Sequence, residues 1–113
     1  MKSNDLASKT CEPCRGGIPP LDPERAREYL EATPGWTLSE DGRRIWKRFR
    51  FSTFPESIAF VNQVAEMAES EGHHPDLHIH YTEVEAILWT HKIGGLHEND
   101  FILAAKIDRL VGD

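Results

Sequence analysis

Long hydrophobic runs and an excess of positive charge are both absent from this sequence of 113 residues. Its longest apolar run is the five residues 101–105, whereas a transmembrane helix needs about 20, so we expect no membrane span. It has 13 Lys and Arg against 19 Asp and Glu, a net charge of −6, and this acidic balance argues against direct nucleic-acid binding. The N-terminus lacks the apolar core of a signal peptide, which favours a cytoplasmic location.

Cysteine is also rare, because Cys11 and Cys14 are the only two. They are too few for a disulfide framework, and a zinc site would need two further ligands from elsewhere, so free thiols are the favoured state. Both lie in a segment that is rich in Gly and Pro and shows no apolar periodicity. We therefore interpret residues 1–20 as a flexible N-terminal arm, mobile or loosely docked, and residues 21–113 as one domain.

Helical and strand patterns alternate along residues 21–113. Capping and apolar spacing predict helices over 22–33 and 53–71 and a final helix from about 100 to 110. Period-two alternation predicts hairpins over 36–51 and 77–91. Since each helix has one apolar stripe and each strand one apolar face, the order predicts an α+β fold. In it, a single four-stranded antiparallel sheet carries three helices packed on one face (α-β-β-α-β-β-α).

The other face of the predicted sheet is half apolar. Trp46, Ile87 and Trp89 would meet water there in a monomer, and exposed patches of this kind usually mark an interface. The arginines of the first hairpin are interpreted as a solvated or subunit-facing surface. We therefore expect a homo-oligomer, either a dimer or a tetramer.

The second hairpin is predicted to turn around Thr82 and Glu83. This register pairs Tyr81 with Val84, Ile79 with Ala86 and Leu77 with Leu88. If the pairing extended further, His74 would lie opposite His91.

All six histidines lie between positions 73 and 97, namely His73, His74, His78, His80, His91 and His97. Clustered imidazoles suggest either acid/base catalysis or metal binding. The acid/base interpretation rests on the adjacent His73 and His74, at a helix exit before Pro75, and on His91. The alternative is that His73 and His74 merely cap the helix.

A metal site is the rival hypothesis. His78 and His80 share a strand face and could chelate an ion that His74 or His91 completes. Because suitably spaced carboxylate or thiolate ligands are not obvious, no metal is predicted, and the pair is interpreted as surface residues.

The residues that remain form a recognisable pattern. The spacing Glu69-x3-His73-His74-Pro75-x5-Tyr81-x9-His91-x8-Asp100 resembles the signature of the pterin-4a-carbinolamine dehydratases. The resemblance extends from about residue 21 to the C-terminus. The arm, with Cys11-x2-Cys14-x-Gly16-Gly17, is similar to the N-terminal extension of many bacterial members.

The resemblance implies a hydro-lyase that converts 4a-hydroxytetrahydropterin to quinonoid dihydropterin and water. The reaction consists of proton transfers, so no cofactor is expected, and the pterin is the substrate. This step would help to regenerate the pterin after an aromatic amino acid hydroxylase has used it. A histidine-rich metal-binding module and a non-catalytic dimerisation or regulatory module remain as alternatives, since animal members of the family also act as dimerisation cofactors.

The resemblance also implies roles for individual residues. His73 and His91 would be the general acid and base, and His74 would chiefly bind substrate with a share in proton transfer. Glu69 and Asp100 would orient the imidazoles. Trp36 would lie either in the wall of the pocket or in the core. His97 stands where relatives carry a Ser or Thr cap, which predicts a helix start weaker by about 1 kcal/mol. The substrate-binding segments would be His73-His74-Pro75 and Thr90-His91-Lys92-Ile93.

Overall fold

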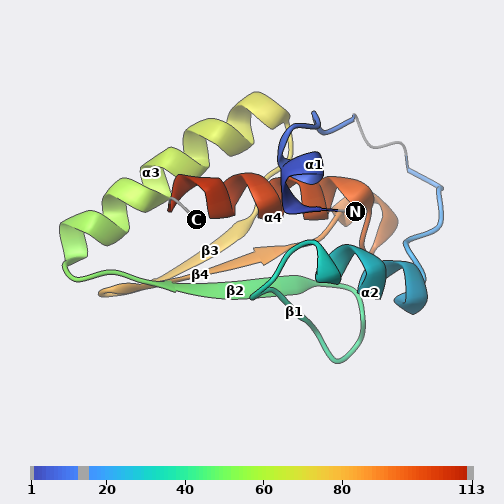
Figure 1. Cartoon of the computed structure of the whole chain (residues 1–113), viewed down its shortest axis with the longest axis horizontal. Helices are drawn as coiled ribbons and strands as arrows, with labels where there is room; N and C mark the ends of the chain where they lie inside the picture. Colours follow the sequence, from blue (N-terminus) through green and yellow to red (C-terminus); the bar gives the residue numbers. More distant parts are fainter. Residues whose placement is uncertain (1, 13–15, 112–113) are drawn as a thin grey trace.

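The computed structural model describes residues 2–12 and 16–111. Its four strands form one antiparallel sheet in the order β1-β2-β4-β3, and α3 and α4 lie across one face of it (Figure 1). The predicted α+β fold is confirmed, with one extra helix, α1, at the N-terminus. The elements are α1 (Ser3–Ala7), α2 (Pro23–Glu31), β1 (Thr37–Leu38), β2 (Ile45–Arg50), α3 (Phe54–Glu71), β3 (Asp76–His80), β4 (Glu83–Leu88), the short 3-10 turn η1 (His91–Ile93) and α4 (Glu98–Leu110).

The first two long helices begin where their capping residues predict, whereas α2 ends at Glu31, two residues before its predicted end. The Asp22 side chain accepts a hydrogen bond from the Arg25 N–H at 2.8 Å, and Thr53 accepts one from the Glu56 N–H at 3.3 Å. α3 ends at Gly72, whose φ of 67° lies in the left-handed region that glycine adopts without strain. This turn directs the chain from the end of α3 toward β3.

The start of α4 is better capped than the sequence predicts. Nδ1 of His97 accepts a hydrogen bond from the Asn99 N–H at 3.0 Å, and Oδ2 of Asp100 accepts one from the His97 N–H at 3.0 Å. The expectation of a weaker cap was wrong, because the imidazole nitrogen serves as the acceptor that a Ser or Thr hydroxyl would supply.

The second hairpin differs from its predicted register by two residues. Leu77 pairs with Ala86 and Ile79 pairs with Val84, so the turn consists of Tyr81 and Thr82. Tyr81 takes a φ of 57°, an uncommon conformation for a tyrosine that nothing in the sequence signals. A shift of two residues preserves which side chains face the core, and the strand pairing ends at Asp76 and Ile87, so it does not extend to His74 and His91.

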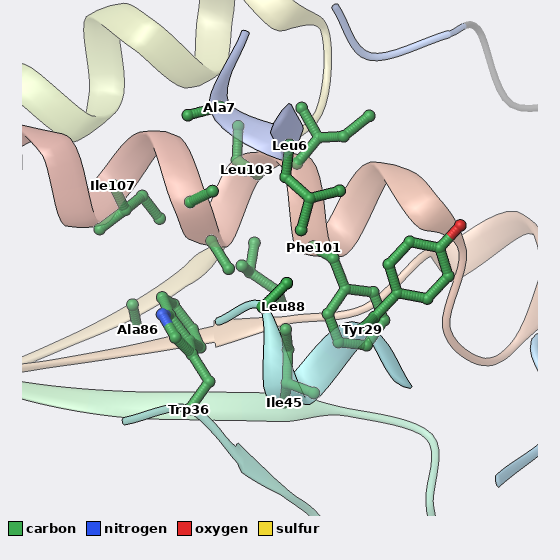
Figure 2. Packing of buried hydrophobic residues seen from close by; sticks show 14 of the residues in the cluster. Leu6, Ala7, Tyr29, Trp36, Ile45, Ala86, Leu88, Phe101, Leu103 and Ile107 are labelled. Atoms are coloured by element: carbon green, nitrogen blue, oxygen red, sulfur yellow. The ribbon is translucent and has the colours of Figure 1, made fainter. Parts of the chain in front are cut away.

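The core lies between the sheet and the helices. Figure 2 shows the Tyr29 ring beside that of Phe101, with their centroids 4.9 Å apart in a stacked arrangement. Leu88 of β4 and Leu103 of α4 are fully buried in the same cluster. This packing fixes α4 against β4, the two elements that carry or precede the site residues.

The described part of residues 1–20 packs differently from the flexible arm that the sequence predicts. Leu6 has no exposed surface and Ala7 only 4%, and α1 lies against α4 (Figure 1). Cys11 is buried as a free cysteine, whereas Cys14 lies outside the described residues. Two apolar residues on one short helix are too few to produce a periodic pattern, which explains why the sequence did not predict this docking.

The open face of the sheet is partly covered by its own arginines. The Arg44 guanidinium lies 4.5 Å from the centre of the Trp89 ring, and that of Arg48 lies 5.2 Å from the Trp46 ring. These cations shield two of the three apolar side chains that the sequence places there.

Among the helices of residues 2–12 and 16–111, none has both the length and the apolar character needed to cross a membrane.

Candidate active site

A cavity lies where α3 ends and η1 begins. Its volume is about 440 Å³, and it contains all three of the histidines predicted to be catalytic. The lining residues are Gly72, His73, His74, Trp89, Thr90, His91 and Lys92. Two segments that are far apart in the sequence, 72–74 and 89–92, therefore form one site, as the predicted substrate-binding segments require.

His73 is held by a buried carboxylate. Its Nε2 atom lies 2.6 Å from Oδ1 of Asp100, and Asp100 has no exposed surface. The other oxygen of Asp100 accepts hydrogen bonds from Oγ1 of Thr90 at 2.8 Å and from the His97 N–H at 3.0 Å. If Asp100 is ionised, its carboxylate only accepts hydrogen bonds, and the 2.6 Å contact then requires the proton to be on Nε2 of His73. In the neutral ring this leaves Nδ1 as the atom that accepts a proton.

His74 is held far more loosely. Its Nε2 atom lies 2.9 Å from Oε1 of Glu69, but the two side chains are 61% and 83% exposed. Water screens such a pair, so it contributes little to stability. Glu69 was predicted to orient the imidazoles, and the structure places it beside His74 rather than His73.

His91 lies against an indole. The His91 and Trp89 ring centroids are 4.0 Å apart, with an angle of 40° between the planes. Trp89 is itself anchored, because its Nε1–H donates to Oδ2 of Asp76 at 3.2 Å and Arg44 covers its ring. The indole restricts where the exposed His91 ring can lie.

Besides the orienting carboxylates Glu69 and Asp100, three predicted site residues do not line the cavity. Pro75 follows His74 and turns the chain into β3, and Ile93 ends η1. Trp36 is only 6% exposed, and its Nε1–H donates to Oδ2 of Asp108 at 3.1 Å. Of its two predicted positions, Trp36 takes the one in the core (Figure 2).

Two lining residues were absent from the predicted site. Gly72 is there because the helix end itself forms part of the cavity. Trp89 could have been found from the strand alternation, since residues two apart on an extended chain share a face and Trp89 precedes His91 by two positions.

The remaining strand histidines lie on the open face of the sheet. Nδ1 of His78 lies 3.3 Å from Oε1 of Glu85, and the register places His80 opposite Glu83. The part of the chain that the structure describes has no group of three or more His, Cys, Asp or Glu side chains arranged to hold a metal ion.

Comparisons with known proteins agree with this geometry. The family model for pterin 4 alpha carbinolamine dehydratase matches residues 19–110. A Halorhodospira halophila protein, whose name provisionally assigns it to pterin-4-alpha-carbinolamine dehydratase, is 51% identical over 105 residues, covering 93% of this chain and 96% of that protein.

Solved structures show the same fold. The crystal structure of a transcriptional coactivator/pterin dehydratase from Brucella melitensis has a TM-score of 0.77 at 33% identity, covering 82% of this chain and 99% of that one. A pterin dehydratase-like protein described as a RuBisCO assembly factor in the alpha-carboxysome has a TM-score of 0.62 at 26% identity, covering 71% and 93%. The family match and the near full-length similarity together lead to one conclusion: the chain belongs to the pterin 4 alpha carbinolamine dehydratase family.

Proposed function

We propose that this chain is a hydro-lyase that dehydrates 4a-hydroxytetrahydropterin to quinonoid dihydropterin and water. The observation that carries the proposal is the convergence of His73, His74 and His91 on one cavity of about 440 Å³. The residue types suit the reaction, because histidine is the side chain that most readily gives and takes protons near neutral pH. Family membership supplies the substrate class.

The chemistry needs two proton transfers and no change of oxidation state. The bond between C4a and the hydroxyl oxygen breaks, and a general acid protonates that oxygen so that it leaves as water. A general base removes the proton from N5, and the electron pair forms the C4a=N5 double bond. Each well-placed acid or base typically contributes about 10²- to 10⁴-fold to the rate, so two of them suffice without a cofactor.

His73 and His91 carry out these two proton transfers, one as the general acid and the other as the general base. The Asp100 carboxylate holds His73 through Nε2, and it stabilises the imidazolium that forms when Nδ1 accepts a proton. His91 approaches from η1, with Trp89 behind its ring. His74, which is more exposed, binds the substrate and shares in proton transfer.

The flanking segments bind the pterin ring. Thr90 and Lys92 line the cavity, whereas Ile93 ends η1 beside them and Pro75 stiffens the segment after His74. In this arrangement the substrate is the carbinolamine that an aromatic amino acid hydroxylase leaves, and the dihydropterin product needs a separate reduction before the hydroxylase can use it again. The open sheet face with Trp46 and Ile87 mediates homo-oligomer formation.

A binding role without turnover is the second candidate. The descriptions of the two structural neighbours name a transcriptional coactivator and a RuBisCO assembly factor, so proteins of this fold also serve in assembly or regulation. The presence of His73, His74 and His91 at one cavity, with the buried Asp100 bonded to His73, favours catalysis here.

Stopped-flow absorbance separates these candidates. The wild-type protein should convert 4a-hydroxytetrahydropterin to quinonoid dihydropterin faster than the spontaneous reaction, and EDTA should leave that rate unchanged. A folded protein that does not accelerate the reaction would overturn the proposal in favour of a binding role, and a rate abolished by EDTA would favour a metal-dependent one.

A further inference from the structure

Two consecutive residues of the N-terminal segment, Cys11 and Glu12, form hydrogen bonds to two helices. One is α3, which ends two residues before His73, and the other is α4, which contains Asp100. The Cys11 N–H donates to Oε1 of Glu71 at 2.8 Å. Glu71 is the last residue of α3, two positions before His73. The N-terminal segment is thus bonded directly to the helix end from which His73 extends.

The next residue is bonded to the other helix. The Glu12 N–H donates to Oδ1 of Asn99 at 2.9 Å, and Nδ2 of Asn99 donates to the Glu12 carbonyl oxygen at 2.6 Å. Asn99 is only 2% exposed and immediately precedes Asp100. The Asn99 side-chain amide thus both donates a hydrogen bond to the Glu12 backbone and accepts one from it, as the backbone of a neighbouring strand would. The two bonds together fix the position of Glu12 relative to the start of α4.

The charge on Glu71 strengthens the first contact. Burial raises the pKa of Glu71, but the hydrogen bond from the Cys11 N–H and the nearby Lys106 outweigh that effect and lower it overall. The Lys106 Nζ atom of α4 lies 3.5 Å from Oε2 of Glu71. The carboxylate therefore joins the N-terminal segment, α3 and α4 at one point.

We propose that the backbone of residues 11–12, together with the Glu71 and Asn99 side chains, positions the His73 imidazole against Asp100. We name these four residues the N-terminal clamp. The His73–Asp100 contact of 2.6 Å exists only while the end of α3 and the start of α4 hold their relative positions. An error of about 1 Å in the placement of a catalytic group can lower a rate by about 10²-fold, so the clamp sets the catalytic rate without touching the substrate.

The test compares two variants that break the clamp with two that spare it. Asn99→Leu removes both bonds to Glu12 at similar side-chain volume, and Glu71→Ala removes the acceptor for the Cys11 N–H. Glu71→Gln keeps a carbonyl oxygen for that N–H and is the conservative rescue. Lys9→Ala is the matched control, because it removes only the surface ion pair of this segment with Glu98, at 2.9 Å.

The kinetic result rests on the proposed function. At a temperature where every variant is folded, kcat should fall by at least about tenfold in Asn99→Leu and Glu71→Ala with a KM change of under about threefold. Glu71→Gln and Lys9→Ala should stay within about threefold of wild type. Wild-type kcat in Glu71→Ala would overturn the inference, even if Asn99→Leu failed to fold.

A second readout needs no turnover. The His73 ring N–H that is bonded to Asp100 should give a low-field proton resonance, assigned by its loss in His73→Gln. We expect this resonance to broaden or shift upfield in Asn99→Leu and Glu71→Ala and to stay unchanged in Lys9→Ala. If it is unchanged in both clamp variants, the clamp is refuted; if the wild-type protein shows the resonance but no dehydration, the proposed function fails while the clamp is still tested.

Discussion

Nε2 of His73 lies 2.6 Å from Oδ1 of Asp100, a carboxylate with no exposed surface. A buried charge is tolerated only when hydrogen bonds replace the water that it has lost. Asp100 obtains them from His73, from Thr90 of the opposite cavity segment and from the His97 N–H that begins α4. The Asp100 carboxylate thus both caps the start of α4 and orients the His73 imidazole.

Replacing Asp100 with Asn should reduce both catalysis and stability. The amide keeps the size of the carboxylate but can present its NH₂ group to His73, which favours the wrong tautomer and removes the charge that stabilises the imidazolium. We expect kcat to fall by about 10²-fold or more and the free energy of unfolding by about 1–3 kcal/mol, measured by stopped-flow absorbance and urea denaturation. Equal kcat in Asp100→Asn and wild type would show that the carboxylate has no part in proton transfer.

Trp89 should matter for activity although it carries no titratable group. Trp89→Leu removes the ring behind His91 and part of the cavity wall, so we expect kcat/KM to decrease by about three- to tenfold, since one aromatic contact contributes about 0.5–1.5 kcal/mol. Trp46→Leu is the control, because its indole lies on the same sheet face under Arg48 but outside the cavity. Similar losses in both variants would point to a general effect of the sheet face instead.

His97 should behave as a helix cap. His97→Ala removes the Nδ1 acceptor for the Asn99 N–H and should lower the free energy of unfolding by about 1 kcal/mol. His97→Ser should restore most of that loss, because its hydroxyl can accept the same hydrogen bond. Urea denaturation of the three proteins decides the matter; if the Ala variant is as stable as wild type, the cap contributes nothing.

Cys11 should be unreactive in the folded protein. Burial foremost, and then the nearby Glu71, raises the pKa of its thiol from the ordinary 9.0 to about 12, and alkylating reagents attack the thiolate. In a Cys14→Ser background, iodoacetamide at about pH 8 should therefore modify Cys11 much faster in urea than in buffer, as followed by mass spectrometry. Equal rates in the two conditions would contradict the burial of this thiol.

The same shift predicts a loss of stability at high pH. Between pH 9.0 and about 12 the unfolded thiol ionises while the folded one keeps its proton. The free energy of unfolding should therefore fall as the pH rises through this range, because the unfolded state then binds fewer protons. Cys11→Ala should make the free energy of unfolding less dependent on pH in this range, as measured by thermal unfolding. If the pH dependence is unchanged in this variant, other groups cause it.

Local signals predicted most of the fold. Asp22, Thr53 and Gly72 mark helix ends through their own backbone chemistry, so the helix limits follow from single residues. The register of the second hairpin could not be predicted, because a shift of two residues leaves the same side chains in the core and depends on the left-handed Tyr81. The docking of α1 depends on Leu6 and a surface formed elsewhere in the chain.

Only the part of the candidate site that consists of residues of the spaced motif could be predicted from the sequence. The motif contains His73, His74 and His91, and the structure brings them to one cavity. Glu71 and Asn99 lie beside motif residues, but their partners are backbone groups of a distant segment, and no side-chain pattern signals such contacts. Trp36 illustrates the reverse case, because an aromatic residue suits a pocket wall or a core equally well until its neighbours are known.

The proposed dehydration depends most directly on acid/base catalysis by histidines of the cavity. The decisive measurement is the stopped-flow rate of 4a-hydroxytetrahydropterin dehydration by His73→Ala and His91→Ala, with His80→Ala as the control for an exposed histidine outside the cavity. We predict losses of about 10²- to 10⁴-fold in the first two variants and a rate within about twofold of wild type in the third. If His73→Ala and His91→Ala dehydrate the substrate as fast as His80→Ala does, the proposed mechanism is wrong.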